Sequence, residues 1–399
     1  MSDIAATDAP DAKLEVRFIA SMREIAAAAW DACAGADNPF VSHAFLSALE
    51  DSGSATQATG WLARHVVIEA EGKGVVAVMP MYAKGHSFGE YVFDHGWADA
   101  FERAGGRYYP KLQAAVPFTP VPGPRLMVRD GANAPALRRA LVQSAIALAE
   151  RAELSSLHVT FLPEAEMADL SGLGLLRRTG LQFHWANDGY DSFDDFLATL
   201  AARKRKQIKR ERREALAAGL TVRVLGGQEL RERHWDAFYD FYQDTGSRKW
   251  GAPYLTREFF SLLGERMSEA VVFILVERAG RPIAGALNLK GSDALYGRNW
   301  GAIEYHPFVH FEACYYQAID YAIAHRLKRV EAGAQGEHKL ARGYLPVPTY
   351  SMHWIAHAGL RRAIEGFLAR ESPFVIQEIE LLAAHAPFHC ASADGDRKV

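Results

Sequence analysis

Apolar and polar residues follow the same order of predicted elements in both halves of the chain. In the first half, short apolar runs predict strands at 66–68 and 75–79, with a turn at 71–74 between them. Apolar residues at helical spacing predict a helix over 137–152, and a strand follows at 157–161. Each of these elements has a counterpart in the second half. The counterparts are strands at 271–277, 283–290 and 294–300, a helix over 311–327 and a strand at 329–332.

A β-meander followed by a helix and a strand is typical of GNAT-type acyltransferases. We therefore expect an α/β (α+β) fold with two tandem GNAT-like lobes, each a mixed β-sheet flanked by helices. A turn signal at 187–189 and a capping box of Ser192 and Asp195 indicate the boundary between the lobes. The prediction is a loose tail over 1–14, an N-terminal lobe over 15–187, a C-terminal lobe over 188–385 that begins with a basic helix over 192–218, and a loose tail over 386–399.

Composition narrows the protein class. The chain has 399 residues, 49% hydrophobic and 23% charged, and a net charge of −3, which gives no overall attraction to nucleic acid or anionic membranes. Three cysteines without a CxxC pair exclude a disulfide scaffold and a four-cysteine zinc site. We see no secretory leader and no apolar run long enough to cross a bilayer. We therefore expect a cytoplasmic protein without membrane insertion.

Common catalytic motifs are missing from the sequence. There is no P-loop, no GxGxxG after a strand and no GxSxG elbow, so nucleotide hydrolysis, hydride transfer and serine hydrolysis have no support. The histidine pairs 306/310 and 353/357 have the spacing of zinc ligands but lack the glutamate of HExxH. We expect these histidines to cap helices or pack in the core, and we expect no metal.

The densest group of reactive side chains lies directly after the last predicted strand of the second half. Glu337 or His338 can accept a proton from an attacking amine, and Lys339 can stabilise an oxyanion. The alternative is an exposed polar turn without chemistry. We predict these three residues to be catalytic, with substrate-binding side chains nearby at Glu331, Gln335 and Arg342, and at Arg298 and Trp300 on the preceding strand.

A second candidate region, over 80–125, mixes aromatic and charged residues. Its prolines argue against a helix or a central strand, and long ordered loops of this kind commonly line a groove. The alternative is an irregular part of the core. The substrate-binding residues that we predict in this groove are Lys84, His86, Tyr91, Asp94, Trp97, Tyr109 and Lys111.

Eight of the eleven residues at 203–213 are cationic. Arranged as a helix, they surround most of its circumference, and such a helix can bind phosphates. The alternative is a solvent-exposed face whose positive charges balance those of the acidic residues before it. We predict that Arg203 and Lys206 bind the phosphates of a donor.

Across roughly 35–375 the sequence resembles the FemAB-like family of N-acyltransferases, called peptidoglycan biosynthesis/recognition proteins and related to GNAT enzymes. The segments that carry this resemblance are 38–40, 79–82 with Lys84, 86–97, 108–112, 117–120, 123–125, 182–185 with Asn187, 203–213, 283–287, 295–298 with Trp300 and Gly301, 310–312 with 314–316, and 331–339.

The resemblance implies two GNAT-like lobes and a transferase that moves an acyl or aminoacyl group onto a primary amine. It is compatible with an acceptor that is a peptidoglycan precursor or an amino-acid-like molecule. The donor is either acyl-CoA or aminoacyl-tRNA, so tRNA is a possible partner, and we expect no tightly bound cofactor. The alternative function is a non-catalytic module that recognises a cell-wall or peptide ligand.

Overall fold

The computed structural model describes residues 13–217, 219–248, 253–333 and 336–389, except for the side chain of Glu337. It divides into two compact units that are not contiguous in sequence. Within the described residues, unit 1 contains 13–118, 122–178 and 350–368, and unit 2 contains 119–121, 179–349 and 369–389. The units thus differ from the two sequential lobes predicted above, because a late segment of the chain belongs to unit 1.

Unit 1 contains two sets of strands. One is an antiparallel sheet in the order β1-β3-β4-β7, and the other has the order β15-β8-β6-β5-β2, in which only β6 and β8 are parallel. Its elements are β1 (Leu14–Ile19), α1 (Ala27–Ala34), α2 (His43–Asp51), β2 (Trp61–Ala63), β3 (His65–Ala70), β4 (Gly74–Met79), β5 (Met81–Lys84), α3 (His95–Arg103), β6 (Lys111–Ala114), β7 (Met127–Val128), α4 (Ala134–Arg151), β8 (Ser156–Thr160) and α5 (Glu164–Ala168).

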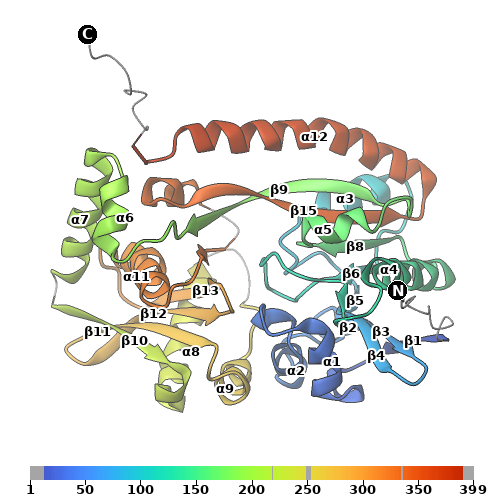
Figure 1. The fold of residues 1–399 in the computed structure, drawn as a ribbon, viewed down its shortest axis with the longest axis horizontal. Coiled ribbons are helices and arrows are strands. Elements are labelled where there is room, and N and C mark those ends of the chain that lie inside the picture. Colours follow the sequence, from blue (N-terminus) through green and yellow to red (C-terminus); the bar gives the residue numbers. More distant parts are fainter. Residues whose placement is uncertain (1–12, 218, 249–252, 334–335, 390–399) are drawn as a thin grey trace, which may run out of the picture. The chain divides into compact units, whose positions relative to one another are not determined.

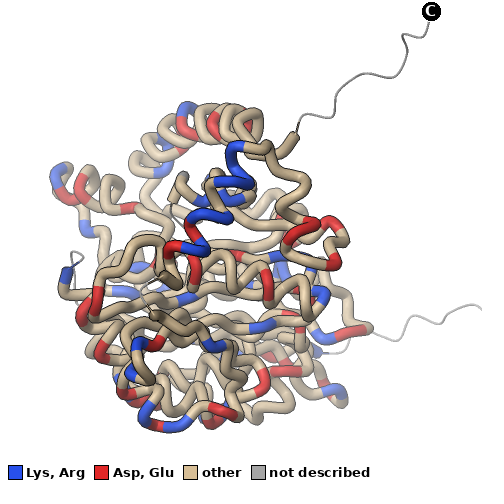
Figure 2. The backbone as a smooth tube through the Cα atoms, turned by 90° about the vertical axis from the view of Figure 1, so that its left-hand side faces the viewer, with Lys and Arg blue, Asp and Glu red and all other residues tan. Residues whose placement is uncertain are grey.

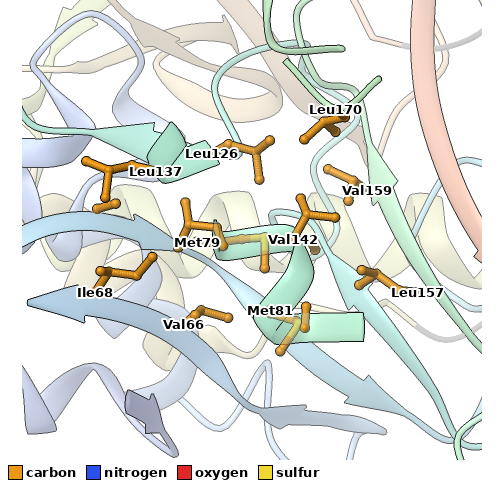
Figure 3. Packing of buried hydrophobic residues seen from close by; sticks show 14 of the residues in the cluster. Val66, Ile68, Met79, Met81, Leu126, Leu137, Val142, Leu157, Val159 and Leu170 are labelled. Carbon is orange, nitrogen blue, oxygen red and sulfur yellow. The ribbon is translucent and has the colours of Figure 1, made fainter. Parts of the chain in front are cut away.

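Helix α4 organises the core of unit 1. It begins where the Asn133 side chain accepts a hydrogen bond from the backbone of Ala136, and its buried stripe includes Leu137, Leu141 and Ala145. The stripe packs against apolar side chains of β3, β4 and β8 in one cluster (Figure 3). The predicted strands at 66–68, 75–79 and 157–161 and the helix over 137–152 are thus confirmed, with small shifts at their ends.

Three elements have residues in both units. They are β9 (Leu176–Ala186), β15 (Leu345–Ile355) and α12 (Ala358–Ala384) (Figure 1). In unit 1, β8 pairs with residues 351–355 of β15, which lie about 190 residues later in the chain. The sequence does not indicate this long-range pairing of β8 with β15, because each strand has an ordinary apolar alternation.

Unit 2 has one mixed sheet in the order β10-β11-β12-β13-β14-β9, antiparallel except for the pair β13 and β14. Its remaining elements are α6 (Phe193–Thr199), α7 (Ala202–Leu216), β10 (Leu220–Gly226), α8 (Glu232–Arg248), α9 (Arg257–Arg266), β11 (Val271–Arg278), β12 (Arg281–Lys290), β13 (Ala294–Ala302), α10 (Val309–Phe311), a π-helical turn (Glu312–Tyr316), α11 (Gln317–Ala324), β14 (Arg329–Glu331) and a 3-10 turn (Glu337–Arg342). The predicted strands of the second half and the helix near 311–327 are confirmed.

A glycine on β13 lets helix α8 lie close to the sheet of unit 2. Helix α8 packs on β12 and β13, and a Cβ on Gly301 would lie 2.4 Å from the backbone of Phe241. Helix α11 packs against β13 and β14 of the same sheet. Among the described helices, none has both the length and the apolar character that crossing a bilayer requires.

The single basic helix predicted over 192–218 is wrong, because the chain forms α6 and α7 with a break at 200–201. Leu200 is extended and forms a β-bridge with Phe388, and the backbone N–H of Ala201 donates to the carbonyl of Pro387 at 2.8 Å. These partners, nearly 190 residues away, replace the hydrogen bonds of a continuous helix. Neither glycine nor proline marks the break in the sequence.

Candidate active site

In unit 2, strands β13 and β14 pair over only three residues and then diverge. Their parallel register ends at Tyr296 and Glu331, whereas β13 continues to Ala302 beside β12. The next residue of β13, Gly297, faces the departing chain, and a Cβ there would lie 3.5 Å from the carbonyl oxygen of Glu331. The predicted reactive segment therefore begins at the point where the two strands separate.

Glu331 lies at this point with one oxygen unpaired. It is 4% exposed, and its Oε1 accepts a hydrogen bond from Arg329 Nε at 2.9 Å. Its Oε2 has no hydrogen-bond partner within the described residues, and His184 Nε2 lies 3.8 Å away. Burial raises the pKa of Glu331 to about 7, although the Arg329 charge opposes the shift. A buried carboxyl with this pKa can gain or lose a proton near neutral pH.

Lys339 is the second buried titratable group of the region. It is 2% exposed, and its Nζ donates to the carbonyl of Gly333 at 2.8 Å. Burial lowers the pKa of Lys339 to about 8. The pKa of His184 on β9 is lowered mainly by burial, then by the charge of Arg329 and then by that of Lys339. The charge of Lys339 is therefore felt at β9 and β14.

The other predicted residues of this segment differ in their surroundings. His338 is exposed as a residue, although its ring is partly buried. Its Nε2 and the Tyr315 hydroxyl share a hydrogen bond of 2.8 Å, and the partial burial of the ring lowers the pKa of His338. Gln335 and the side chain of Glu337 lie outside the described residues. The catalytic roles predicted for Glu337, His338 and Lys339 stay predictions.

Arg342 anchors the 3-10 turn to α7. Its Nη2 donates to both carboxylate oxygens of the buried Glu211, at 3.0 and 2.9 Å, and its Nη1 donates to the carbonyl of His338 at 2.7 Å. Its guanidinium lies 3.4 Å from the centre of the Phe311 ring, and the Tyr316 hydroxyl donates to Glu211. Arg342 thus holds the backbone beside Lys339, and its predicted contact with substrate stays a prediction.

A cavity of about 610 Å³ lies beside the 3-10 turn. Its wall includes Trp300 at the end of β13 and His310 and Phe311 at the start of the following helix. The ring centres of His310 and His338 are 6.2 Å apart, so the cavity adjoins the segment that contains Lys339. Arg298, the other predicted substrate-binding residue of β13, is half-buried two residues before Trp300.

In unit 1, the region predicted as a groove wall contains a buried ionic cluster. Lys111 Nζ donates to Glu90 Oε2 at 2.7 Å, to Ser87 Oγ at 2.8 Å and to Asp94. Lys84 Nζ lies 3.5 Å from the centre of the Trp61 ring. The charged members of the cluster have almost no exposed surface.

The cluster corrects two expectations about 80–125. The segment contains β5, α3 and β6, and β6 is a central strand, because the prolines at 117–124 follow it and do not interrupt it. Lys84, Asp94, Trp97 and Lys111 are buried instead of lining a groove. His86, Tyr91 and Tyr109 are half-buried, and for all seven residues binding of a substrate stays a prediction.

A family model described as FemAB-like, peptidoglycan biosynthesis/recognition, matches residues 21–390. The chain belongs to the FemAB-like family. No curated protein matches its sequence.

Solved structures of low sequence identity share the fold of this FemAB-like protein. FemX has a TM-score of 0.54 at 14% identity, covering 88% of this chain and 100% of its own. The C-terminal domain of a putative lysylphosphatidylglycerol synthetase from Agrobacterium fabrum has a TM-score of 0.52 at 10% identity, covering 84% and 93%. A protein of unknown function from Bacteroides thetaiotaomicron VPI-5482 has a TM-score of 0.51 at 12% identity, covering 86% and 100%. The predicted tandem GNAT-like α/β fold is confirmed.

The cationic residues of the FemAB-like protein's α7 separate into inward and outward groups. Arg212 bonds Glu312 and Asp320, whereas Arg203 and Lys206 are exposed and make no ion pair within the described part of the chain. Figure 2 shows lysine and arginine gathered along this helix. The predicted binding of donor phosphates by Arg203 and Lys206 is compatible with their exposure and stays a prediction.

Sequence reasoning missed a buried histidine pair in unit 1. His158 of β8 and His353 of β15 lie opposite each other, with 2.7 Å between their Nδ1 atoms. Ser156 and Ser351, each two residues earlier on the same strand face, bond the respective Nε2 atoms at 2.8 Å. A Ser-x-His pattern in two apolar strands was the available signal, and it indicates a polar layer on one face of each strand.

Proposed function

We propose that this FemAB-like protein transfers an acyl or aminoacyl group onto a primary amine. The observation that carries the proposal is the buried Oε2 of Glu331 at the separation of β13 and β14, which has no hydrogen-bond partner among the described residues, together with the raised pKa of this carboxyl. The family description, peptidoglycan biosynthesis/recognition, favours a peptide or amino-acid-like amine of a peptidoglycan precursor as the acceptor.

The proposed reaction gives different roles to two residues. Glu331 is the base, and Lys339 acts through the proton that it keeps. An alkyl ammonium with a pKa of about 10.4 must lose one proton to water before its nitrogen can attack. Glu331 accepts the second proton, which the nitrogen loses as the new C–N bond forms. Lys339, in its protonated form, stabilises the oxyanion that forms when the new C–N bond is made. Collapse of the intermediate breaks the C–S or C–O bond to the donor, and Glu331 returns its proton to the leaving thiolate or alkoxide. We favour Glu331 over His338 as the base because the pKa of His338 is lowered.

The donor is acyl-CoA or aminoacyl-tRNA. Both carry phosphates, for which the exposed Arg203 and Lys206 are suitable ligands. Both also occur in the cytoplasm, where we place the protein. Most of the rate acceleration would come from holding donor and acceptor together, since effective molarity is worth roughly 7–11 kcal/mol.

Turnover and binding measured in parallel test the proposal. The Glu331→Gln/Lys339→Ala variant should lose acyl transfer to a lysine-containing peptide and retain the affinity of the peptide, measured by calorimetry. If the wild-type protein binds the peptide and transfers no group from acyl-CoA or aminoacyl-tRNA, the protein is a recognition module and the proposal is wrong.

A further inference from the structure

The cavity in unit 2 has a wall composed largely of rings. Six side chains with aromatic or imidazole rings contribute to it, namely Trp300, Tyr305, His306, Phe308, His310 and Phe311. Its volume of about 610 Å³ lies within the ~300–1,000 Å³ that is usual for small-molecule pockets. That volume is about 20 times the ~30 Å³ share of one water molecule, far more than a two-carbon acyl group requires.

The charged side chains of this wall are already paired. Arg248 bonds Asp244 and the carbonyl of Ala302, and Glu304 accepts hydrogen bonds from Arg278 Nη2 at 2.8 Å and shares one with His306 Nε2 at 3.1 Å. A site for a pyrophosphate needs surplus positive charge. The described lining of the cavity has its charges balanced and offers mainly ring faces, which favours an apolar occupant.

One end of the cavity lies beside the residue that precedes Lys339 in the chain. Phe311 and His310 of its wall have ring centres 5.8 and 6.2 Å from that of His338, the residue directly before Lys339. Phe311 also carries the guanidinium of Arg342, which holds the 3-10 turn. The cavity therefore adjoins the 3-10 turn that contains Lys339.

We infer that this cavity holds the substituent of the transferred acyl group and selects a bulky apolar acyl group over acetyl. The inference rests on the proposed function, because it assigns the cavity to the donor of that reaction. Burial of each additional methylene should increase affinity roughly fourfold, the ratio that corresponds to ~0.8 kcal/mol.

Binding of simple carboxylic acids to the full-length protein tests the inference without requiring turnover. Calorimetric titration with acetate, butyrate, octanoate and 3-phenylpropionate should show affinity that rises along the series, at least 50-fold from acetate to octanoate or 3-phenylpropionate. Equal affinity across the series would overturn the inference.

Two variants connect that binding to the cavity. Ala302→Leu fills the space, and Phe308→Asn removes a ring while keeping a residue type that tolerates the φ of 63° at this position. Each should reduce octanoate affinity at least tenfold, whereas Phe374→Asn, which removes an exposed ring of α12, should not. Unchanged octanoate binding in both cavity variants, with folding confirmed by circular dichroism, would overturn the inference.

A nucleotide probe separates the remaining possibility. If desulfo-coenzyme A binding is lost in Ala302→Leu and the acid series is flat, the cavity holds the nucleotide of the donor and the inference is wrong. Failure of the proposed function has a different signature, namely no acyl transfer from any donor, whatever the acid series shows.

Discussion

Arg329 and Glu331 form an ion pair that occupies only one of the two carboxylate oxygens. Arg329 Nε donates to Oε1 at 2.9 Å, and Oε2 lies buried without a hydrogen-bond partner in the described part of the chain. An unpaired buried oxygen is costly, so native structures contain few of them. This oxygen lies at the end of β14, where β13 and β14 separate, and it is the proton acceptor in the transfer that we propose.

Replacement of Glu331 by glutamine should abolish most turnover. The amide keeps the acceptor oxygen for Arg329 and cannot take a proton, so we expect kcat to fall roughly 100-fold or more while KM changes little. Steady-state kinetics measure the effect. Glu265→Gln, which alters an exposed carboxylate of α9, should retain full activity, and an equal loss in both variants would rule out a specific role for Glu331.

The rate should depend on pH as a bell. Burial raises the pKa of Glu331 to about 7, so its basic form accumulates as pH rises through this value. Burial lowers the pKa of Lys339 to about 8, so its protonated form is lost above that value. We expect kcat/KM to be highest between these values. In Lys339→Arg the alkaline limb should disappear, because arginine keeps its proton, and an unchanged alkaline limb would assign it to another group.

The Glu211–Arg342 pair should matter more for stability than its neighbours on α7. Both side chains are buried, so Glu211→Gln leaves a buried charge partly unpaired and should lower the free energy of unfolding by about 3 kcal/mol. Glu214→Gln, one turn away and exposed, should change it by less than about 0.5 kcal/mol. Urea unfolding followed by circular dichroism measures both. Equal effects would show that burial of the pair has no special weight.

Asp94 should stabilise unit 1 in a pH-dependent way. Burial alone would raise its pKa, but Lys111 and His158 lower it below the usual value. Its contribution is therefore complete above the unfolded pKa of about 4 and is lost as pH falls toward the folded pKa.

The variant Asp94→Asn isolates this effect. Relative to the wild-type protein it should lose roughly 1.5–3 kcal/mol at neutral pH, the range for hydrogen bonds to charged groups. The difference should shrink as pH falls below about 4. A difference that is constant with pH would indicate a packing effect of the substitution.

The sequence predicted the elements whose signal is local. Apolar spacing was sufficient for α4 and for the strands β11 to β13, because neighbouring residues determine it. The break at 200–201 depends on Phe388 and Pro387, and the pair of His158 and His353 depends on the register of two strands distant in sequence. Such long-range partners leave little trace in a single sequence.

For the candidate site, too, the local features could be predicted from the sequence and the long-range ones could not. From the dense polar segment the sequence predicted Lys339 as catalytic and Glu331 as substrate-binding, and both roles stay predictions. The burial of these residues, and with it their pKa values near neutrality, became visible only in the structure. In 80–125, the mixture of aromatic and charged residues suggested a groove, whereas the charges of Lys111 and Asp94 satisfy each other inside the core. Composition alone does not distinguish these two arrangements.

Mass spectrometry of the acceptor is the most direct test of acyl transfer with Glu331 as the base. A lysine-containing peptide is incubated with the wild-type protein or with Glu331→Gln, in the presence of acyl-CoA donors or aminoacyl-tRNA. The account predicts that the peptide gains the mass of one acyl or aminoacyl group with the wild-type protein and gains none above background with the variant. No mass gain with any donor, or the same gain with both proteins, would contradict it.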